Sequence, residues 1–237
     1  MKNQYFGDIN DYRKYGVLRI LSMSRIKIGI CWMLTKDDVN KKDGQITSYN
    51  NLIDYDHELH EKLDKVLSGQ YPRQVSQVPS LGILPDTLFF SDVLDDNIEC
   101  RKAYFEKMLS LFSGVDLIFF DPDNGLEVNS TKYGAIDSSK FLYWCEVKEA
   151  YEWGHSLLIY QHFPRIEHYN YINKRCEEIR THINIDQVYV LKTSTVVYFL
   201  IPQKAHDDRL RLALEKIEER WTGKDGIEVI QNQRIFE

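Results

Sequence analysis

The stretch "IFFDPDNGLEV" (residues 118–128) decides the fold class, because an apolar run ends there in a group of carboxylates. The apolar run that leads into it is typical of a buried strand. Pro122 cannot continue a strand ladder, and Asn124 with Gly125 permits a positive-φ turn. Ligands of open α/β sheets bind beyond the carboxyl ends of the strands. We therefore expect Asp121, the last residue of the strand, to lie at such a crevice.

Strand-like and helix-like segments alternate along the chain. The strand-like runs are residues 27–34, 87–94, 115–121 and 156–163, followed by 186–202, which divides into two strands at 192–194. Helical spacing predicts helices at residues 11–22, 54–69, 98–114, 140–154, 168–183 and 206–221. Strands that alternate with such helices predict βαβ units and a mostly parallel sheet. The final two strands are joined too closely for a parallel crossover, so they predict an antiparallel edge.

These elements predict one Rossmann-like α/β domain over residues 1–237. We expect a three-layer sandwich with a mostly parallel sheet and an antiparallel C-terminal edge. Residues 70–86 are rich in proline and predict an irregular insertion. The sequence "KKDGQ" at residues 41–45 predicts a surface turn.

The composition is that of an ordinary globular protein, with 43% hydrophobic and 28% charged residues of mixed sign. No run approaches the roughly 18 apolar residues of a membrane span, and no apolar signal-peptide core is visible. We therefore expect a cytoplasmic protein. The net charge of −6 argues mildly against a nucleic-acid partner but leaves room for a local basic groove. The four cysteines are spread singly, without the spacing of a zinc site.

The carboxylates Asp121, Asp123 and Glu127 have three interpretations. A single Asp at a strand end can accept a hydrogen bond from a substrate amine. Clustered carboxylates can instead hold Mg²⁺, which prefers hard oxygen ligands. The structural interpretation is a polar turn whose acidic side chains bond their own backbone.

A second informative stretch is "YFGDINDYRKYGVLRIL" (residues 5–21). Gly7 and Asp8 predict a turn, and Asn10 or Asp11 can cap the helix that follows. The stretch is either a capped N-terminal helix or a loop and helix start that close over a ligand.

This N-terminal stretch resembles the F-x-G-N-x-x-D-x-x-K-H signature of the bacterial large-subunit ribosomal RNA adenine-N6 methyltransferases. The family's D-P-P-Y motif corresponds to "DPDN" at residues 121–124. "FFSDVL" resembles the family's acidic strand end, which falls on Asp92. The opening motif is also similar to that of a group of uncharacterised bacterial proteins. The resemblance implies a methyltransferase-type fold and S-adenosylmethionine-dependent methylation of an exocyclic amine on a nucleic-acid base.

The resemblance also implies roles for individual residues. Asp121 would accept a hydrogen bond from the exocyclic amine. The catalytic candidates from the D-P motif are Asp121 and Asp123, to which the end of a neighbouring strand, independently of the resemblance, adds His162. The cofactor candidates come from the N-terminal motif and the acidic strand end, and they are Gly7, Asp8, Lys14 and Asp92.

Two alternatives to methyl transfer stay open. A divalent-metal-dependent nuclease or hydrolase would hold Mg²⁺ through Asp8, Asp11, Asp121 and Asp123. The other alternative is a non-catalytic binding module on a decayed methyltransferase fold. Asp123 and Asn124 replace the family's second proline and the aromatic residue that stacks on a flipped base, and an acid there attracts a metal or a cation.

The end of a neighbouring strand offers further candidates. The sequence "IYQHFPR" would bring Gln161, His162 and Arg165 to the same rim. With an unperturbed pKa near 6.5, His162 suits a general base or metal ligand, or it packs as an ordinary strand-end residue. Aromatic and basic residues of the next helix either stack on nucleic acid or form a solvated face. They are Tyr169, Tyr171, Lys174 and Arg175.

Every catalytic interpretation requires the two motifs to meet in space. Asp8 and Asp121 should then share one cleft with Asp123. Crowded acids in dry surroundings require a compensating cation, for which Lys14 and Arg165 are the candidates. Asp121→Asn should leave thermal stability unchanged or slightly raised, because it relieves repulsion, while abolishing the activity.

Overall fold

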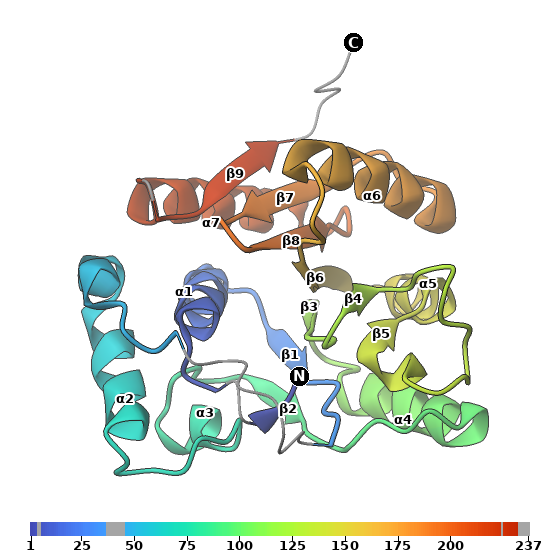
Figure 1. Ribbon diagram of the computed structural model, residues 1–237. Helices are drawn as coiled ribbons and strands as arrows, with labels where there is room; N and C mark the ends of the chain where they lie inside the picture. The colour runs from blue at the N-terminus through green and yellow to red at the C-terminus, as the bar shows by residue number, and fades with distance from the viewer. Residues whose placement is uncertain (4–5, 37–45, 224, 232–237) are drawn as a thin grey trace.

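The computed structural model describes all residues except 4–5, 37–45, 224 and 232–237. Within this part of the chain, one sheet has the order β2-β1-β3-β6-β8-β7-β9 (Figure 1). The strands are β1 Ile28–Cys31, β2 Leu88–Phe90, β3 Leu117–Phe120, β6 Ser156–His162, β7 Tyr189–Lys192, β8 Val196–Ile201 and β9 Glu228–Gln231. Pairings from β2 to β6 are parallel, while β8 pairs antiparallel with both β6 and β7. The predicted parallel sheet with an antiparallel C-terminal edge is confirmed.

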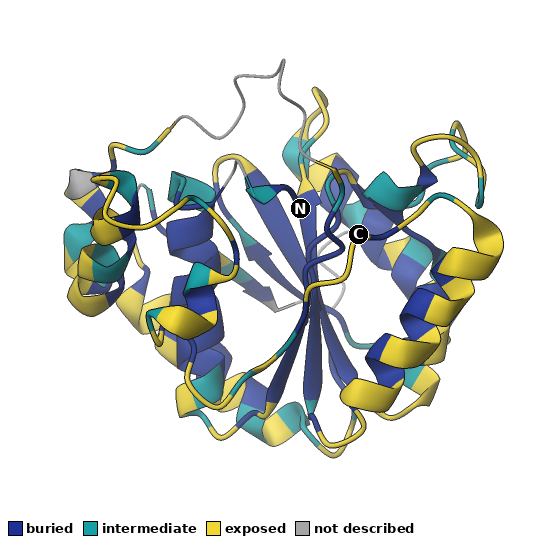
Figure 2. Ribbon diagram, turned by 90° about the horizontal axis from the view of Figure 1, so that it is seen from below, coloured by how far each residue is buried: buried dark blue, intermediate teal, exposed yellow. Residues whose placement is uncertain are grey.

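Helices cover both faces of the sheet. One face carries α1 Ile9–Met23, α2 His57–Leu67 and α7 Asp207–Arg220. The other face carries α4 Ile98–Leu111, α5 Trp144–Glu152 and α6 His168–Ile183. Figure 2 shows the buried sheet between two helical layers whose outer sides are exposed. Among the described helices, none is both long and apolar enough to cross a membrane.

Strand β3 is apolar throughout because both of its faces are covered. Leu117 and Phe119 belong to the core on the α1 side, whereas Ile118 and Phe120 belong to the core on the α4 side. A strand buried on both faces reads as a continuous apolar run instead of an alternating one. The parallel pairing places the ends of β1, β3 and β6 at one edge of the sheet, which we call the carboxyl edge.

Several predicted boundaries were wrong. Helix α1 is capped by Asp8, not by Asn10 or Asp11, because Asp8 Oδ1 accepts bonds of 2.9 Å from the backbone N–H groups of both residues. The predicted helix at 140–154 begins late, at Trp144.

The start of that predicted helix is used differently because of a tertiary pairing. Its first residues form the end of the 3-10 helix η3 Ser138–Lys140 and the strand β5 Phe141–Leu142. Strand β5 pairs in parallel with β4 Gly125–Leu126, which directly follows the D-P motif. Neither β4 nor β9 was predicted.

Residues 70–86 contain the short helix α3 Gln77–Ser80 as their regular element. The predicted turn at 41–45 lies outside the described residues.

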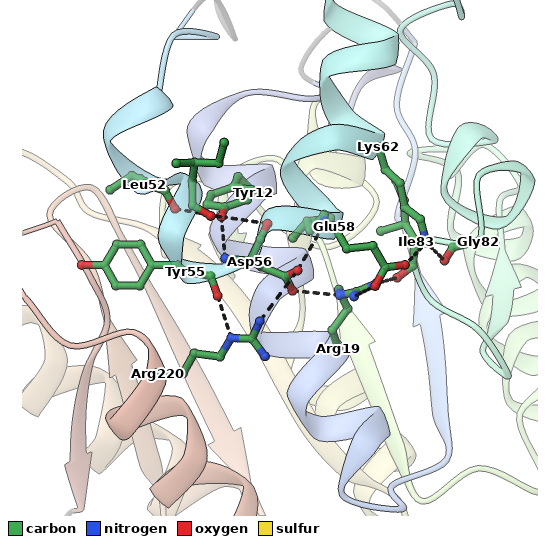
Figure 3. A network of polar contacts seen from close by, with 12 residues as sticks. Tyr12, Arg19, Leu52, Tyr55, Asp56, Glu58, Lys62, Gly82, Ile83 and Arg220 are labelled. Carbon is green, nitrogen blue, oxygen red and sulfur yellow. Dashed lines mark hydrogen bonds and ion pairs between the residues drawn. The ribbon is translucent and has the colours of Figure 1, made fainter.

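A polar network fixes α1 to the 3-10 helix η2 Asn50–Tyr55 and to α2 (Figure 3). Asp56, only 4% exposed, accepts bonds from the Leu59 N–H at 3.1 Å and from Arg19 Nε at 2.9 Å. The Tyr12 hydroxyl accepts a 2.8 Å bond from the Asp56 N–H and donates to the Leu52 carbonyl at 2.8 Å. The start of α1 is thereby held in place over the carboxyl edge.

Candidate functional site

The N-terminal motif and the strand-end motif meet in a buried cluster that we call the ion triad, Asp11–Lys14–Asp121. Lys14 Nζ lies 2.7 Å from Asp11 Oδ1 and 2.7 Å from Asp121 Oδ2, and the three side chains are only 2–3% exposed. Asp121 and Lys14 are separated by 107 positions in the sequence. The compensating cation required by the crowded acids is therefore Lys14.

The ion triad lies in an aromatic environment. Lys14 Nζ is 5.0 Å from the ring centre of Tyr160 and 6.0 Å from that of Trp32. Burial alone would lower the pKa of Lys14, but Asp11 and Asp121 outweigh it and raise this pKa. Burial raises the pKa of Asp11 despite the neighbouring ammonium. A low dielectric strengthens the pairing and penalises any uncompensated charge.

Gly7 and Asp8, both predicted to bind the cofactor, form the start of α1. The Gly7 N–H donates to Asp11 Oδ2 at 2.8 Å, with Gly7 at a φ of 87°. Asp8 caps the helix, and burial together with the nearby Asp11 raises the pKa of Asp8 to about 7.

Asp123 faces the turn after β1. Its Oδ2 accepts a 2.8 Å bond from Thr35 Oγ1, and its Oδ1 lies 2.9 Å from the amino group of Met1. Burial opposes ionisation, but the amino group outweighs it, so the pKa of Asp123 is lowered. Glu127 has a structural contact, because its Oε2 accepts from the Trp144 N–H at 2.7 Å where α5 begins.

Residues 121–126, which we call the rim loop, are bonded to Gln161 at the end of β6. Gln161 is 3% exposed, and its Oε1 accepts from the Leu126 N–H at 2.8 Å. Its Nε2 donates to the Asn124 carbonyl at 3.1 Å and to the His162 carbonyl at 2.9 Å. The sequence had placed Gln161 at the rim without a role. The sequence signal for this role is the Asn124-Gly125 turn, because its buried backbone groups need hydrogen-bond partners from elsewhere in the chain.

Three exposed side chains, Asn124, His162 and Arg165, follow β3 or end β6. We call them the rim. The His162 ring lies 5.0 Å from the Tyr160 ring in an edge-to-face contact. Although the residue is exposed, the surrounding protein desolvates the imidazole and lowers the pKa of His162, against the opposing influence of Asp121. The imidazole is therefore predominantly neutral near pH 7.

The remaining predicted site residues, Asp92 and those of α6, do not contact the ion triad or the rim in the contacts described. Asp92 follows β2 and pairs with Lys107 Nζ at 2.6 Å on the surface. Tyr171 and Arg175 are each 7% exposed, whereas the Lys174 side chain is 71% exposed, so the four residues predicted to stack or steer do not share one exposed face of α6. Tyr169 is exposed and donates to Glu228 at 3.0 Å.

The acids do not form a metal-ligand group. Across the part of the chain that the structure describes, no group of three or more His, Cys, Asp or Glu side chains could hold a metal ion. The Lys14 ammonium lies between Asp11 and Asp121, 2.7 Å from an oxygen of each, and so occupies the place where a cation would bind. The geometry of the described acids therefore does not favour the Mg²⁺ alternative.

The turn after β1 does not fit S-adenosylmethionine in the position that the resemblance implies. Trp32, 1% exposed, stacks on Phe89 with ring centres 6.3 Å apart. Leu34 pairs with Val93, which continues the parallel β1–β2 ladder past the strand ends. No glycine occurs between residues 30 and 43, although close backbone approach of a nucleotide cofactor relies on glycine at such a turn.

No family model matches the chain, and no curated protein matches it. Among solved structures, it is similar to the crystal structure of protein LPL1258 from Legionella pneumophila str. Philadelphia 1, described under the family model DUF519. The TM-score is 0.44 and the sequence identity 12%, over 96% of this chain and 98% of that chain. By its own sheet topology, this chain is a Rossmann-like α/β protein with a parallel core and an antiparallel C-terminal edge.

Proposed function

We propose that the chain is a nucleic-acid-binding module on a methyltransferase-like fold and that it does not use S-adenosylmethionine. One observation carries this proposal. Asp121, the acid at the strand end, is 2% exposed and has Lys14 Nζ 2.7 Å from its Oδ2.

A substrate amine would have to reach a 2% exposed Asp121 whose Oδ2 is already held by an ammonium. The bond between Lys14 and Asp121 is charge-assisted on both sides and is therefore stronger than a bond from a neutral base amine. Moving Lys14 away would leave a buried charge with one partner fewer, which costs about 3–5 kcal/mol when such a pair is broken. The ion triad thus favours a structural role for the acid.

The rim supplies the groups for binding. The Asn124 amide and the neutral His162 imidazole each offer a donor and an acceptor suited to base edges. The Arg165 guanidinium suits a phosphate oxygen pair. Because the whole chain carries a net charge of −6, we expect a small number of phosphate contacts and a shallow salt dependence.

S-adenosylmethionine-dependent methylation of a base amine is the second candidate function. It is favoured by the meeting of the N-terminal motif with the D-P strand end at the carboxyl edge. The filled turn after β1 argues against it.

Two titrations separate the candidates. Labelled single-stranded RNA and DNA are titrated into the protein at low and at physiological salt, with Arg165→Ala beside the natural chain. S-adenosylhomocysteine is titrated by calorimetry at millimolar concentration. We expect oligonucleotide binding that Arg165→Ala weakens, and no heat from the cofactor product.

The outcomes are distinct. Absence of oligonucleotide binding would overturn the binding-module proposal. Binding of S-adenosylhomocysteine, or transfer of labelled methyl groups to RNA, would instead establish the methyltransferase function.

A further inference from the structure

The rim loop is held by one buried side chain that bonds to both of its sides. Gln161 Oε1 accepts from Leu126, and Gln161 Nε2 donates to the carbonyls of Asn124 and His162. Two of the three rim residues therefore have their backbone fixed by the same nitrogen atom. Gln161 Nε2 thereby connects the end of β6 to the loop that follows β3.

The loop packs against this amide without spare room. Gly125 has a φ of 92°, and a Cβ atom built there would lie 2.1 Å from Gln161 Oε1. The position requires a planar group with one oxygen that accepts a hydrogen bond and one nitrogen that donates two, and a primary carboxamide has both. An ionised carboxylate of the same shape could accept from Leu126 but could not donate to Asn124 and His162.

We propose that Gln161 is a positioning residue that sets the spacing between Asn124 and His162 for a bound nucleic-acid base. This inference rests on the proposed function. Gln161 is 3% exposed, so it acts on the ligand only through the rim residues that it holds.

The loop has other attachments that keep it folded when Gln161 is altered. The Asn124 N–H donates to the Lys140 carbonyl at 2.8 Å, and the Glu127 N–H donates to the Leu142 carbonyl at 2.8 Å. Loss of the Gln161 bonds should therefore loosen the spacing of the rim without unfolding the protein.

The chain offers a matched control in Gln203, just past the end of β8 at the opposite edge of the sheet. Gln203 Nε2 also donates to backbone carbonyls, those of Tyr151 at 2.6 Å and His155 at 3.4 Å. Substitution at either position removes comparable bonds, but only Gln161 contacts the rim loop.

The experiment compares Gln161→Met and Gln203→Met in oligonucleotide binding, thermal unfolding and hydrogen exchange of the peptide covering residues 121–127. We expect both variants to melt earlier, since each loses side-chain hydrogen bonds to the backbone. Only Gln161→Met should exchange faster in that peptide and bind about tenfold more weakly, the effect of one lost bond of about 1.4 kcal/mol. Equal weakening by both variants, or unchanged binding by Gln161→Met, would overturn the proposal.

Gln161→Glu provides a conservative rescue. Its carboxyl can donate one hydrogen bond once it is protonated, so its binding defect relative to the natural chain should shrink as the pH falls. A defect that does not change with pH contradicts the required donor.

The two proposals can fail separately. If the natural chain binds no oligonucleotide, the proposed function fails and the ligand role of Gln161 fails with it. If the natural chain binds and Gln161→Met loosens the loop without weakening binding, only the positioning role fails.

Discussion

Two aspartates flank strand β3 and differ in how far they are buried. Asp121, after the strand, is closed off with Lys14 at 2% exposure. Asp116, before the strand, keeps 20% of its side chain exposed, 3.0 Å from Arg209 and 3.4 Å from His206. The same residue type thus forms a fixed buried pair at one edge and a partly hydrated, titratable contact at the other. Burial, more than the presence of a partner, decides how much each pair contributes to stability.

The edge at Asp116 also shows why proximity alone does not make an active site. Ser156 Oγ lies 2.9 Å from His206 Nδ1, and His206 Nε2 lies 3.4 Å from Asp116, a Ser–His–Asp series. However, Ser156 is fully buried and its oxygen accepts a 2.8 Å bond from the Gln203 N–H. A nucleophile must reach its substrate, so this series is a structural contact between α7 and the sheet.

The largest expected effect comes from removing the buried cation. Lys14→Met leaves Asp11 and Asp121 uncompensated and should lower the free energy of unfolding by about 3–5 kcal/mol. Arg209→Met removes the cation facing Asp116 and should cost less than about 1 kcal/mol, because that pair is partly exposed. Urea unfolding of both variants measures the difference. Equal losses would mean that burial does not distinguish the two edges.

Substituting the acids should give a smaller contrast. Asp121→Asn should lower the free energy of unfolding by about 1–3 kcal/mol, since Lys14 keeps one partner but loses an ionic bond. This revises the expectation, based on sequence alone, that relieved repulsion would leave stability unchanged or raised. Asp116→Asn should cost less than about 1 kcal/mol. A stabilised Asp121→Asn protein in the same urea assay would show that repulsion prevails after all.

Asp8, which lies at the carboxyl edge, should make the free energy of unfolding depend on pH. Its pKa is about 7 in the folded chain against an ordinary 3.8. The folded state therefore holds the proton more tightly, and stability is lost as the pH rises from about 4 through 7. Asp8→Asn keeps an effective helix cap and removes this loss. We expect it to stabilise the protein at pH 8 and hardly at all at pH 4, where the Asp8 carboxyl of the folded chain is already protonated. Thermal unfolding across this range provides the test, and a gain independent of pH would contradict it.

The smallest expected effect lies at the opposite edge and has the opposite sign. Burial lowers the pKa values of His155 and His206 below 6.5. The folded state disfavours their protonation, so stability is present above pH 6.5 and is lost as the pH falls below it. Between pH 6.5 and 5, His155→Asn should reduce the loss of unfolding free energy by less than about 1 kcal/mol. An unchanged slope in denaturant titrations at several pH values would assign the acid sensitivity to other groups.

The fold was predictable because its signals are local. The apolar runs of β3 and β6 and the spacing of α6 follow from short-range periodicity, and the structure places them where the patterns predicted. Strand β4 escaped prediction because its two residues become a strand only by pairing with β5. A pairing between segments that are distant in the sequence leaves no periodic trace of its own.

The candidate site was predictable only in outline. That a cation must accompany Asp121 followed from electrostatics, but the choice between Lys14 and Arg165 depends on the register of α1. Capping by Asp8 sets this register and directs Lys14 toward the sheet. Asp92 was placed in a cofactor pocket because "FFSDVL" resembles the acidic strand end of the methyltransferase family. The strand ends at Phe90, and Asp92 pairs with surface Lys107.

The distance along the chain between Lys14 and Asp121 has a consequence for biosynthesis. Helix α1 is translated before β3, and 107 further residues must be added after Lys14 before Asp121 is reached. At about 5–20 residues per second, this takes several seconds, during which Lys14 has Asp11 as its neighbour but cannot be enclosed by the sheet. Contacts of such long sequence separation form slowly because closing a large loop costs entropy first. Until β3 has been translated, Lys14 therefore lacks the second carboxylate of the ion triad.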